Sequence, residues 1–407
     1  MFPILFELGT TSVLLELAEE FRNRGHTVIF AGSGNFKDYV IYKGFEVENL
    51  PEVNHELYMK KISNANLDFH NKSTIASFVK SEINLLKKVS PDVVFDVFRP
   101  TLYISSKVTS IPRINISNTV LTKYYNADLS IPEGYWLYNF TNINPLISNI
   151  AHKIFPTIKD VLLRHWVNPY NEVLKKYNLP RLKSVLDLFD GDITFLMDAS
   201  EFAPVVNLPA NVLQFGPITH NFSANMPVWF NNVRKKNGIK LYVSMGSTGT
   251  MIASVLRDLI EIYGNKENFY IISNTVFPLK TSFSKLPSNF FISDFLPPQK
   301  ILNIVDLVIT HGGRGSVYHA LTHGVPIIGI PHQTEQQWNV ERVENLGLGI
   351  KISPKKYSPI LLKNAIDEIL SKTIYRNNAQ DFQNKLSKYN AIPNIVNFVE
   401  YKYAKKG

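Results

Sequence analysis

The residue types best suited to chemistry gather in one short run, His311 to Ser316, which reads HGGRGS. Three of its six residues are glycines, which let the backbone turn tightly and approach a ligand without side-chain clashes. A histidine and a serine add hydrogen-bond donors. Placed before a helix, such a run predicts a phosphate seat, because the free N–H groups and the helix dipole both favour an anion.

The flanking residues predict the elements that position this run. Leu307–Thr310 is a short apolar stretch typical of a buried parallel strand, and Val317–Leu321 has the apolar spacing of a helix. A second apolar strand is expected at Ile327–Ile330, followed by the polar string His332–Gln337 before another helix. The result is a βαβ unit with polar loops at the carboxyl ends of its strands, where open α/β sheets bind ligands.

The segment as a whole contains the patterns HGGxGS, GVPxIxxP, EQxxN and LGxG, in that order, between His311 and Gly349. This arrangement resembles the donor-binding signature of the UDP-glycosyltransferase-like family, which are nucleotide-sugar-dependent glycosyltransferases with the GT-B fold. The resemblance implies an α/β fold with two Rossmann-like, doubly wound domains that face each other across a cleft. It also implies sugar transfer with inversion from a nucleotide sugar, with a UDP-sugar as the expected donor, to a hydroxyl acceptor.

The resemblance assigns roles to residues of the expected second domain. His311 would donate to the diphosphate, Glu335 and Gln336 would hold the sugar hydroxyls, and Phe295 would stack on the base. A second strand-to-glycine-loop junction begins at Ser244, and it would add hydroxyl donors to the phosphate site. The expected donor-binding set is Ser247, Thr248, Phe295, His311, Gly313, Gly315, Ser316, Glu335 and Gln336. Since these groups would stabilise the leaving diphosphate, we expect no metal and no cofactor besides the nucleotide-sugar co-substrate.

Two positions depart from the family pattern. Where many relatives carry an acid that holds the ribose hydroxyls, this chain has His319. Where relatives carry a catalytic histidine after the first strand, this chain has Thr10, while Asp96 occupies the position of its partner aspartate. A threonine is not a base at neutral pH, so Asp96 is the expected base and Thr10 its neighbour in the catalytic site. If Asp96 is structural, the base is to be sought among His55, His70 and Glu7.

Composition bounds the remaining possibilities. The 407 residues suit two domains, and 45% hydrophobic with 19% charged residues is typical of a globular protein. The chain has no cysteine, no apolar run long enough for a transmembrane helix and no signal-peptide pattern at its start, so a cytoplasmic protein is expected. The formal charge of +9 is compatible with peripheral contact with an anionic membrane, whereas no basic run interleaved with aromatic residues suggests nucleic acid.

The predicted organisation follows from strands, helices and breaks along the chain. A first strand is expected at Ile4–Leu8, before a helix with apolar residues from Val13 to Phe21. An aromatic-rich segment between Tyr124 and Trp166 is either core or the wall of an acceptor site. The expected divisions are an acceptor domain at 1–220, a linker at 221–236, a nucleotide-sugar domain at 237–375, and a helical segment at 376–407 that returns to the first domain.

Three functions remain open at this level. The leading one is a metal-independent inverting glycosyltransferase whose acceptor is a hydroxyl compound, with a lipid or isoprenoid alcohol as one candidate. The loss of the histidine suggests instead a nucleotide-sugar-binding protein with impaired catalysis, and the same architecture also occurs in UDP-sugar epimerases. The triplet Asp190-Gly191-Asp192 resembles a metal-binding DxD motif. It precedes a strand instead of following one, so it is not expected to bind a metal.

Overall fold

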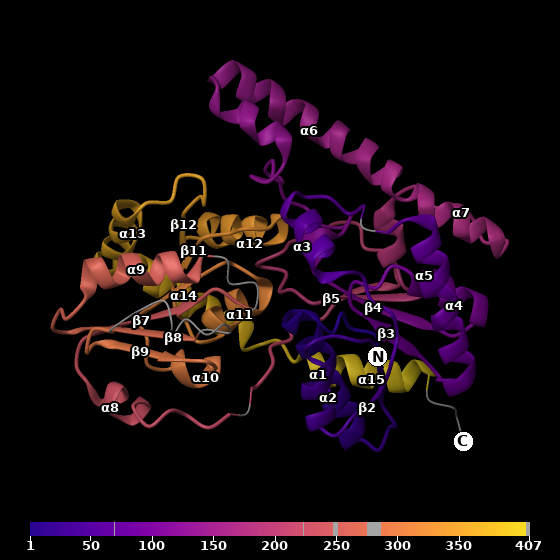
Figure 1. The fold of residues 1–407 in the computed structure, drawn as a ribbon, viewed down its shortest axis with the longest axis horizontal. Coiled ribbons are helices and arrows are strands. Elements are labelled where there is room, and N and C mark those ends of the chain that lie inside the picture. The colour runs from indigo at the N-terminus through magenta and orange to yellow at the C-terminus, as the bar shows by residue number, and fades with distance from the viewer. Residues whose placement is uncertain (69, 223, 247–250, 275–285, 404–407) are drawn as a thin grey trace. The chain divides into compact units, whose positions relative to one another are not determined.

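The computed structural model describes residues 1–68, 70–222, 224–246, 251–274 and 286–403, in two compact units (Figure 1). Unit 1 comprises Met1–Ile218 and Tyr389–Gly407, and unit 2 comprises Thr219–Lys388. Its α/β architecture with parallel sheets in two domains confirms the predicted fold class.

The chain returns to unit 1 at Tyr389, later than the predicted boundary at 376. The reason is that helix α14 (Thr373–Leu386) packs on helix α11 (Arg314–Thr322) of unit 2, where Gln383 Nε2 donates to Thr322 O at 2.9 Å. Within the predicted linker, α8 (Phe230–Lys235) is likewise part of unit 2.

Unit 2 is built on one parallel sheet of six strands in the order β12-β11-β10-β7-β8-β9. The strands are β7 (Ile239–Ser244), β8 (Phe269–Asn274), β9 (Phe290–Ser293), β10 (Leu307–Thr310), β11 (Ile327–Gly329) and β12 (Gly349–Lys351). The chain adds β8 and β9 on one side of β7, and β10 and its successors on the other. The strand order therefore reverses between β7 and β10, and such switch points are where doubly wound sheets bind ligands.

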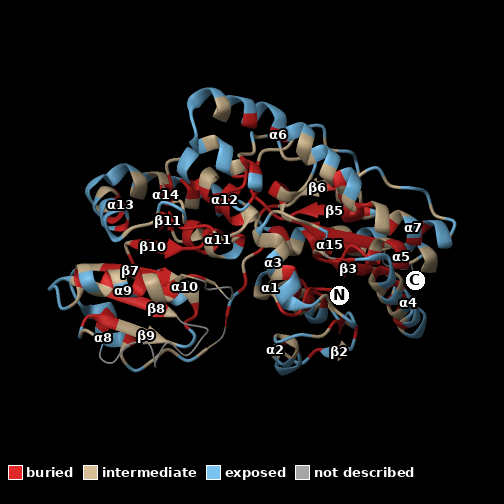
Figure 2. Ribbon diagram, turned by 45° about the horizontal axis from the view of Figure 1, so that its top comes forward, coloured by how far each residue is buried: buried red, intermediate tan, exposed pale blue. Residues whose placement is uncertain are grey.

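The helices of unit 2 cover a sheet whose strands are almost uniformly apolar. Leu241, Val243, Ile271 and Ile309 are fully buried in a core shared with α9 (Ile252–Tyr263) and α13 (Pro359–Ser371). Figure 2 shows this buried layer within exposed helix faces. Continuous apolar runs are expected where helices cover both faces of a parallel sheet. The remaining helices are α10 (Pro298–Ile301) and α12 (Thr334–Asn345).

Close packing of α12 depends on two glycines. A Cβ at Gly312 would lie 2.2 Å from Val340 Cγ2, and one at Gly329 would lie 2.4 Å from the same side chain. Gly312 also has φ +83°, a conformation that other residues adopt only with strain. These glycines let α12 pack directly against the ends of β10 and β11, which places the first turn of α12 beside that of α11.

Unit 1 contains a four-stranded parallel sheet in the order β3-β4-β5-β6 and a separate parallel pair, β1-β2. The strands are β1 (Ile29–Ala31), β2 (Glu46–Glu48), β3 (Val94–Asp96), β4 (Arg113–Ser117), β5 (Ile193–Leu196) and β6 (Val212–Gln214). The helices are α1 (Leu8–Asn23), α2 (Lys37–Tyr42), α3 (His55–Ser63), α4 (Lys72–Val89), α5 (Leu102–Thr109), α6 (Pro145–Trp166), α7 (Asn168–Lys176) and α15 (Ala391–Tyr403).

The predicted strand at Ile4–Leu8 is wrong. The extended backbone lies earlier, where Ala31 N donates to Met1 O at 2.9 Å and Phe2 N donates to Phe95 O at 2.8 Å. Met1–Phe2 thus lies between β1 and β3, and α1 already begins at Leu8. The helix starts early because hydroxyls of its first turn donate back to the preceding carbonyls.

The C-terminal helix α15 completes the core of unit 1. Ile395, Val396 and Val399 are buried against α1. At the rim, Glu400 accepts from Arg24 Nη1 at 2.9 Å, and its second oxygen lies 2.9 Å from His26 Nε2. Among the described residues, no helix has both the length and the apolar character needed to span a membrane.

A buried ion pair joins the carboxyl end of β3 to the start of β4. Asp96 is fully buried, and Arg113 is 1% exposed. Arg113 Nε donates to Asp96 Oδ1 at 2.8 Å, and its Nη2 donates to Oδ2 at 3.1 Å. Asn115 Nδ2 also donates to Oδ2, at 3.0 Å. Both carboxylate oxygens are therefore occupied inside the protein.

We expect Asp96→Asn to lower the free energy of unfolding of unit 1 by about 3–5 kcal/mol, because it leaves the Arg113 charge buried without its counter-charge. Chemical denaturation measures this loss, and a double variant with Arg113→Met should recover part of it. As a control, Lys363→Ala removes an exposed ion pair with Asp367 and should cost less than about 1 kcal/mol. An Asp96→Asn protein of unchanged stability that has lost sugar transfer would instead support the catalytic role predicted for Asp96.

Candidate functional site

The candidate site in unit 2 begins where β7 and β10 end side by side. Thr310 pairs with Ser244 across these parallel strands, and His311 follows Thr310 directly. The His311 ring lies between two glycines, since a Cβ at Gly246 would approach its Cε1 to 2.5 Å and one at Gly313 would approach its Nε2 to 2.6 Å. Only glycine at these two positions leaves room for the imidazole.

His311 is an uncharged donor in this environment. The side chain is 9% exposed, and burial lowers the pKa of His311 to about 4. The nearby His332 lowers the pKa further, whereas a hydrogen bond with the Ser244 backbone raises it. The ring is therefore neutral at pH 7 and carries one N–H, and its Nδ1 lies 3.2 Å from Thr310 Oγ1.

Helix α11 starts immediately after this histidine. Gly313 is its N-cap, and Gly315 and Ser316 lie in its first turn. A Cβ at Gly315 would meet nothing within 4 Å, so the space in front of this turn is open. The buried Arg314 guanidinium lies 5.0 Å from the Tyr318 ring of the same helix. The helix terminus can therefore receive an anion through its backbone N–H groups.

The predicted sugar-binding pair lies at the start of α12, next to α11. Glu335 Oε1 accepts from Arg314 N at 3.3 Å and from Asn339 Nδ2 at 2.5 Å. Gln336 is 3% exposed, and its Oε1 accepts from His332 N at 2.9 Å. Glu335 is thus the more exposed member of the pair, while Gln336 also shapes the loop in front of its helix.

An aromatic cluster connects two positions that the sequence pattern treated separately. Phe295, which is 39% exposed, lies 5.5 Å from the Phe222 ring, and Phe222 lies 6.3 Å from His319. His220 contacts Phe222 at 4.4 Å. Sequence reasoning missed Phe222 and His220 because they lie at the edge of the predicted linker and belong to no motif.

The structure thus brings His311, Gly313, Gly315, Ser316, Glu335 and Gln336 to the ends of neighbouring strands and helices of one unit. Phe295 lies in the same unit, after β9. Ser247 and Thr248 lie outside the described residues. Asn339 also belongs to the site, because its Nδ2 donates to Gly312 O at 3.1 Å and so links α12 to the glycine loop. The EQxxN pattern already contained this residue.

The predicted catalytic residues lie in unit 1, where both make structural contacts. Thr10 Oγ1 donates to Ile4 O at 2.9 Å and to Glu7 O at 3.2 Å, at the start of α1. Asp96 forms the buried ion pair with Arg113. A base must reach the acceptor proton with a lone pair that is free to accept it. The Asp96 carboxylate is fully buried and accepts from Arg113, Asn115 and the Arg99 backbone, and its role as the base stays a prediction.

The other candidate bases differ in their surroundings. His70 is 6% exposed, its Nδ1 lies 2.8 Å from Tyr170 Oη, and burial lowers its pKa to about 3. His55 is exposed at the first position of α3, and its ring lies 4.9 Å from Phe6. Phe6 precedes α1, and Thr10, at the position that the family resemblance gives to the catalytic histidine, lies in the first turn of that helix. His55 is therefore an accessible imidazole beside the altered loop.

The DxD-like triplet connects strands. Asp192 Oδ2 accepts from Arg113 N at 2.8 Å, and Asp192 N donates to Arg113 O at 2.8 Å. Asp190 accepts from Lys123 Nζ at 2.5 Å and from Tyr124 Oη at 3.1 Å. Both carboxylates are engaged in holding the start of β4 and the segment before β5.

Comparisons with known proteins agree with this arrangement. The family described as erythromycin biosynthesis protein CIII-like, C-terminal domain, matches residues 272–398. A PGL/p-HBAD biosynthesis glycosyltransferase of Mycobacterium tuberculosis is 26% identical over 80% of this chain and 73% of its own length. A PGL/p-HBAD biosynthesis rhamnosyltransferase of Mycobacterium bovis is 25% identical over 76% of this chain and 66% of its own length. An inactive PGL/p-HBAD biosynthesis glycosyltransferase of Mycobacterium bovis is 26% identical over 48% of this chain and 51% of its own length.

Solved structures share the fold over nearly the whole chain. The glycosyltransferase of kitacinnamycin has a TM-score of 0.73 at 17% identity and covers 99% of this chain and 98% of its own. Spinosyn rhamnosyltransferase SpnG complexed with thymidine diphosphate has a TM-score of 0.67 at 14% identity and covers 96% of both chains. The predicted resemblance is confirmed: the chain is similar to glycosyltransferases of the UDP-glycosyltransferase-like family, and its fold is GT-B.

Proposed function

We propose that this glycosyltransferase transfers a hexose, with inversion, from a nucleoside diphosphate sugar to a hydroxyl group of an apolar acceptor. The acceptor oxygen attacks the anomeric carbon, the bond from that carbon to the diphosphate oxygen breaks, and a base takes the hydroxyl proton. The observation that carries this proposal is the neutral His311 held at the head of α11, at the point where the strand order reverses.

The donor side follows from charge. Negative charge grows on the diphosphate as its bond to the sugar breaks, and donors fixed in advance stabilise it without reorganisation. The His311 N–H and the N–H groups of the α11 terminus are such donors. We propose a UDP-sugar as the donor. A thymidine diphosphate sugar is the second candidate, because a solved relative binds thymidine diphosphate and because His319 replaces the usual ribose-binding acid.

A second candidate function is nucleotide-sugar binding without efficient transfer. It is favoured by Thr10 in place of the catalytic histidine and by a relative named as inactive. Transfer to water or to an alcohol, measured as release of the nucleoside diphosphate, separates the enzyme from a binding protein. Donor binding without any release would establish the second candidate.

We expect His311→Ala to lower kcat by about 10²–10³, the usual effect of removing one preorganised donor to a developing oxyanion. Because the pKa of His311 is about 4, the ring stays neutral above that value, and the ratio of wild-type to variant rates should not change between pH 6 and 8. His323→Ala, at the other end of α11, is the matched control and should retain transfer. Equal rates for wild type and His311→Ala would rule out this role.

We propose His55 as the base that accepts the proton of the acceptor. His55→Ala should lower kcat by about 10²–10⁴ with little effect on donor binding, which is the range for general-base catalysis. The loss should be smaller for acidic phenols than for alkyl alcohols, because acidic hydroxyls need less help. His70→Asn tests whether the buried histidine serves instead, and an unchanged rate in His55→Ala would exclude His55.

We propose that transfer needs no divalent metal. His311 and the α11 terminus would supply the hydrogen-bond donors to the diphosphate, while Asp190 and Asp192 are engaged by Lys123, Tyr124 and Arg113. Transfer should therefore persist in excess EDTA. Activity that disappears with EDTA and returns with manganese or magnesium would contradict the proposal.

A further inference from the structure

A surface rich in exposed apolar side chains lies on the part of unit 1 formed by α6 and the short helix η2 (Trp136–Asn142) before it. The 18 residues from Gly134 to Ala151 include no acidic, basic or histidine residue. Helix α6 stands away from the β3–β6 sheet of its own unit (Figure 1), and much of its surface is exposed (Figure 2). The remainder of the chain is rich in charge by comparison.

Large apolar side chains form one row along this surface, which we call the η2–α6 face. Its members are 41–71% exposed, and they are Trp136, Phe140, Ile143, Leu146, Ile150, Ile154 and Val161. Within α6, Leu146, Ile150 and Ile154 follow one another at steps of four residues and Val161 follows after seven, which is the spacing of one side of a helix, while Trp136 and Phe140 lie on η2, which packs against α6. These seven are a large share of the 18 exposed large hydrophobic residues found among the described residues, so the row is not random scatter.

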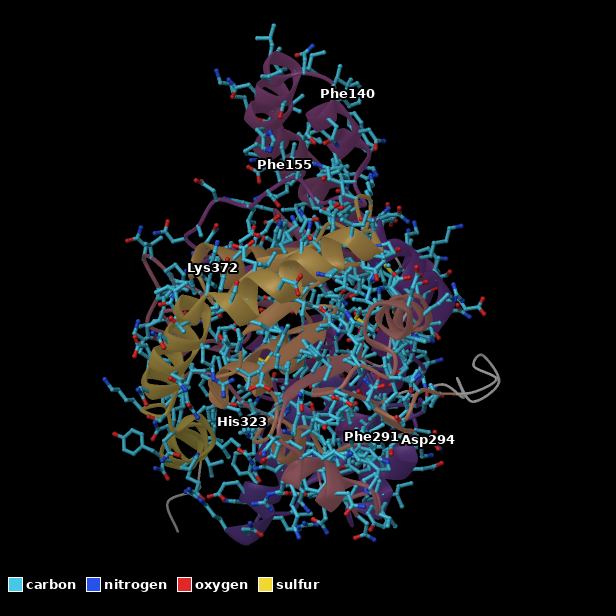
Figure 3. The ribbon with its side chains drawn as sticks, turned by 90° about the vertical axis from the view of Figure 1, so that its left-hand side faces the viewer. Phe140, Phe155, Phe291, Asp294, His323 and Lys372 are labelled. Carbon is cyan, nitrogen blue, oxygen red and sulfur yellow. The ribbon has the colours of Figure 1, made fainter. Side chains whose placement is uncertain are left out.

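The η2–α6 face is not needed for the core beneath it. Tyr135, Leu137, Ala151 and Phe155 are buried together with Ile131 in a small cluster of their own. Phe155 and Phe140 belong to this same projecting part (Figure 3), but Phe155 is 7% exposed and Phe140 is 42% exposed. The segment therefore has a closed inner side and a separate apolar outer side.

The charges beside the face indicate what covers it. Beyond the uncharged stretch, α6 carries Lys153, Lys159 and Arg164 with only one acid, Asp160. Lys153 and Arg164 are exposed, and the whole chain has a formal charge of +9. An apolar row that contains a tryptophan and is bordered by basic residues is typical of helices that lie in the interface of an anionic membrane.

We propose that the η2–α6 face docks this protein on an anionic membrane surface, with the apolar row at the level of the acyl-chain boundary. The basic residues of α6 contact lipid phosphates. The helix lies in the interface and does not span it, because α6 carries charged residues along its second half. This docking would bring an apolar acceptor dissolved in the membrane to unit 1, but the binding itself does not require that transfer occurs.

The test is sedimentation of the full chain with two kinds of vesicle, phosphatidylcholine alone and phosphatidylcholine mixed with phosphatidylglycerol. We expect binding to the anionic vesicles that weakens with salt. The double variant Leu146→Ser/Ile150→Ser should bind the vesicles at least about tenfold more weakly than the wild type, because it removes two leucine-sized side chains from the area buried in the membrane. Lys153→Glu/Arg164→Glu should lose the preference for anionic vesicles.

The matched control is Ile360→Ser/Leu361→Ser, which changes two exposed apolar residues of α13 in unit 2 and should bind like the wild type. Wild-type protein that ignores both vesicles, or a Leu146→Ser/Ile150→Ser variant that binds normally, would overturn the proposal. Two other results for that variant would also overturn the proposal. One is a wild-type protein that is dimeric and a variant that is monomeric, which would make the face a protein interface. The other is loss of transfer to a detergent-dispersed acceptor with vesicle binding unchanged, which would make it an acceptor site.

Discussion

The close approach of two parallel strand ends around one imidazole governs the architecture of unit 2. Because β7 and β10 pair directly, the loops that leave them must share the same space, and the His311 ring occupies it. Any side chain at Gly246 or Gly313 would collide with the ring. The same close packing buries the His311 ring, and this loss of solvation lowers the pKa of His311 and keeps the ring neutral. Helix α12 then packs over Gly312 and Gly329, and so the start of α12 comes to lie beside that of α11.

Unit 1 uses its buried charges differently. At the end of β3, Asp96 pairs with Arg113, and three residues later Arg99 Nε donates to the fully buried Glu82 at 2.7 Å. Thr101 and Ser105 also donate to Glu82. These pairs tie the end of β3 to β4 and to α4. Both carboxylates are therefore neutralised by arginine side chains inside unit 1.

The two units differ in the surfaces that they present. In unit 2, polar groups converge at the strand ends, above a core of buried apolar side chains. In unit 1, the η2–α6 segment has a small core of its own and presents a second apolar side outward. Contact of that outer side with a membrane would remove from water an apolar surface of a kind that proteins in water seldom expose.

Much of the donor site could be predicted from the sequence alone, because its signals are local. The strand at 307–310, the glycine loop after it and the helix that follows lie within 16 residues, and each is encoded by its own apolar spacing or glycine content. The family resemblance and the α/β fold class followed from those patterns. Phe222 could not be found in this way, since its contacts with Phe295 and His319 join residues more than 70 positions apart.

Only the tertiary structure decided which charged groups pair with each other and where the first strand and the exposed apolar surface lie. Asp96 was predicted as the base because it ends a strand at the family's aspartate position, and that role stays a prediction. Its partner Arg113 lies on a different strand, so no local sequence pattern indicated the ion pair. The first strand was misplaced because its hydrogen bonds come from β1 and β3 and not from its own composition. Likewise, the sequence left open whether the segment between Tyr124 and Trp166 is core or the wall of an acceptor site. Whether its apolar side is buried depends on whether another element packs there, and in unit 1 the row from Trp136 to Val161 remains exposed.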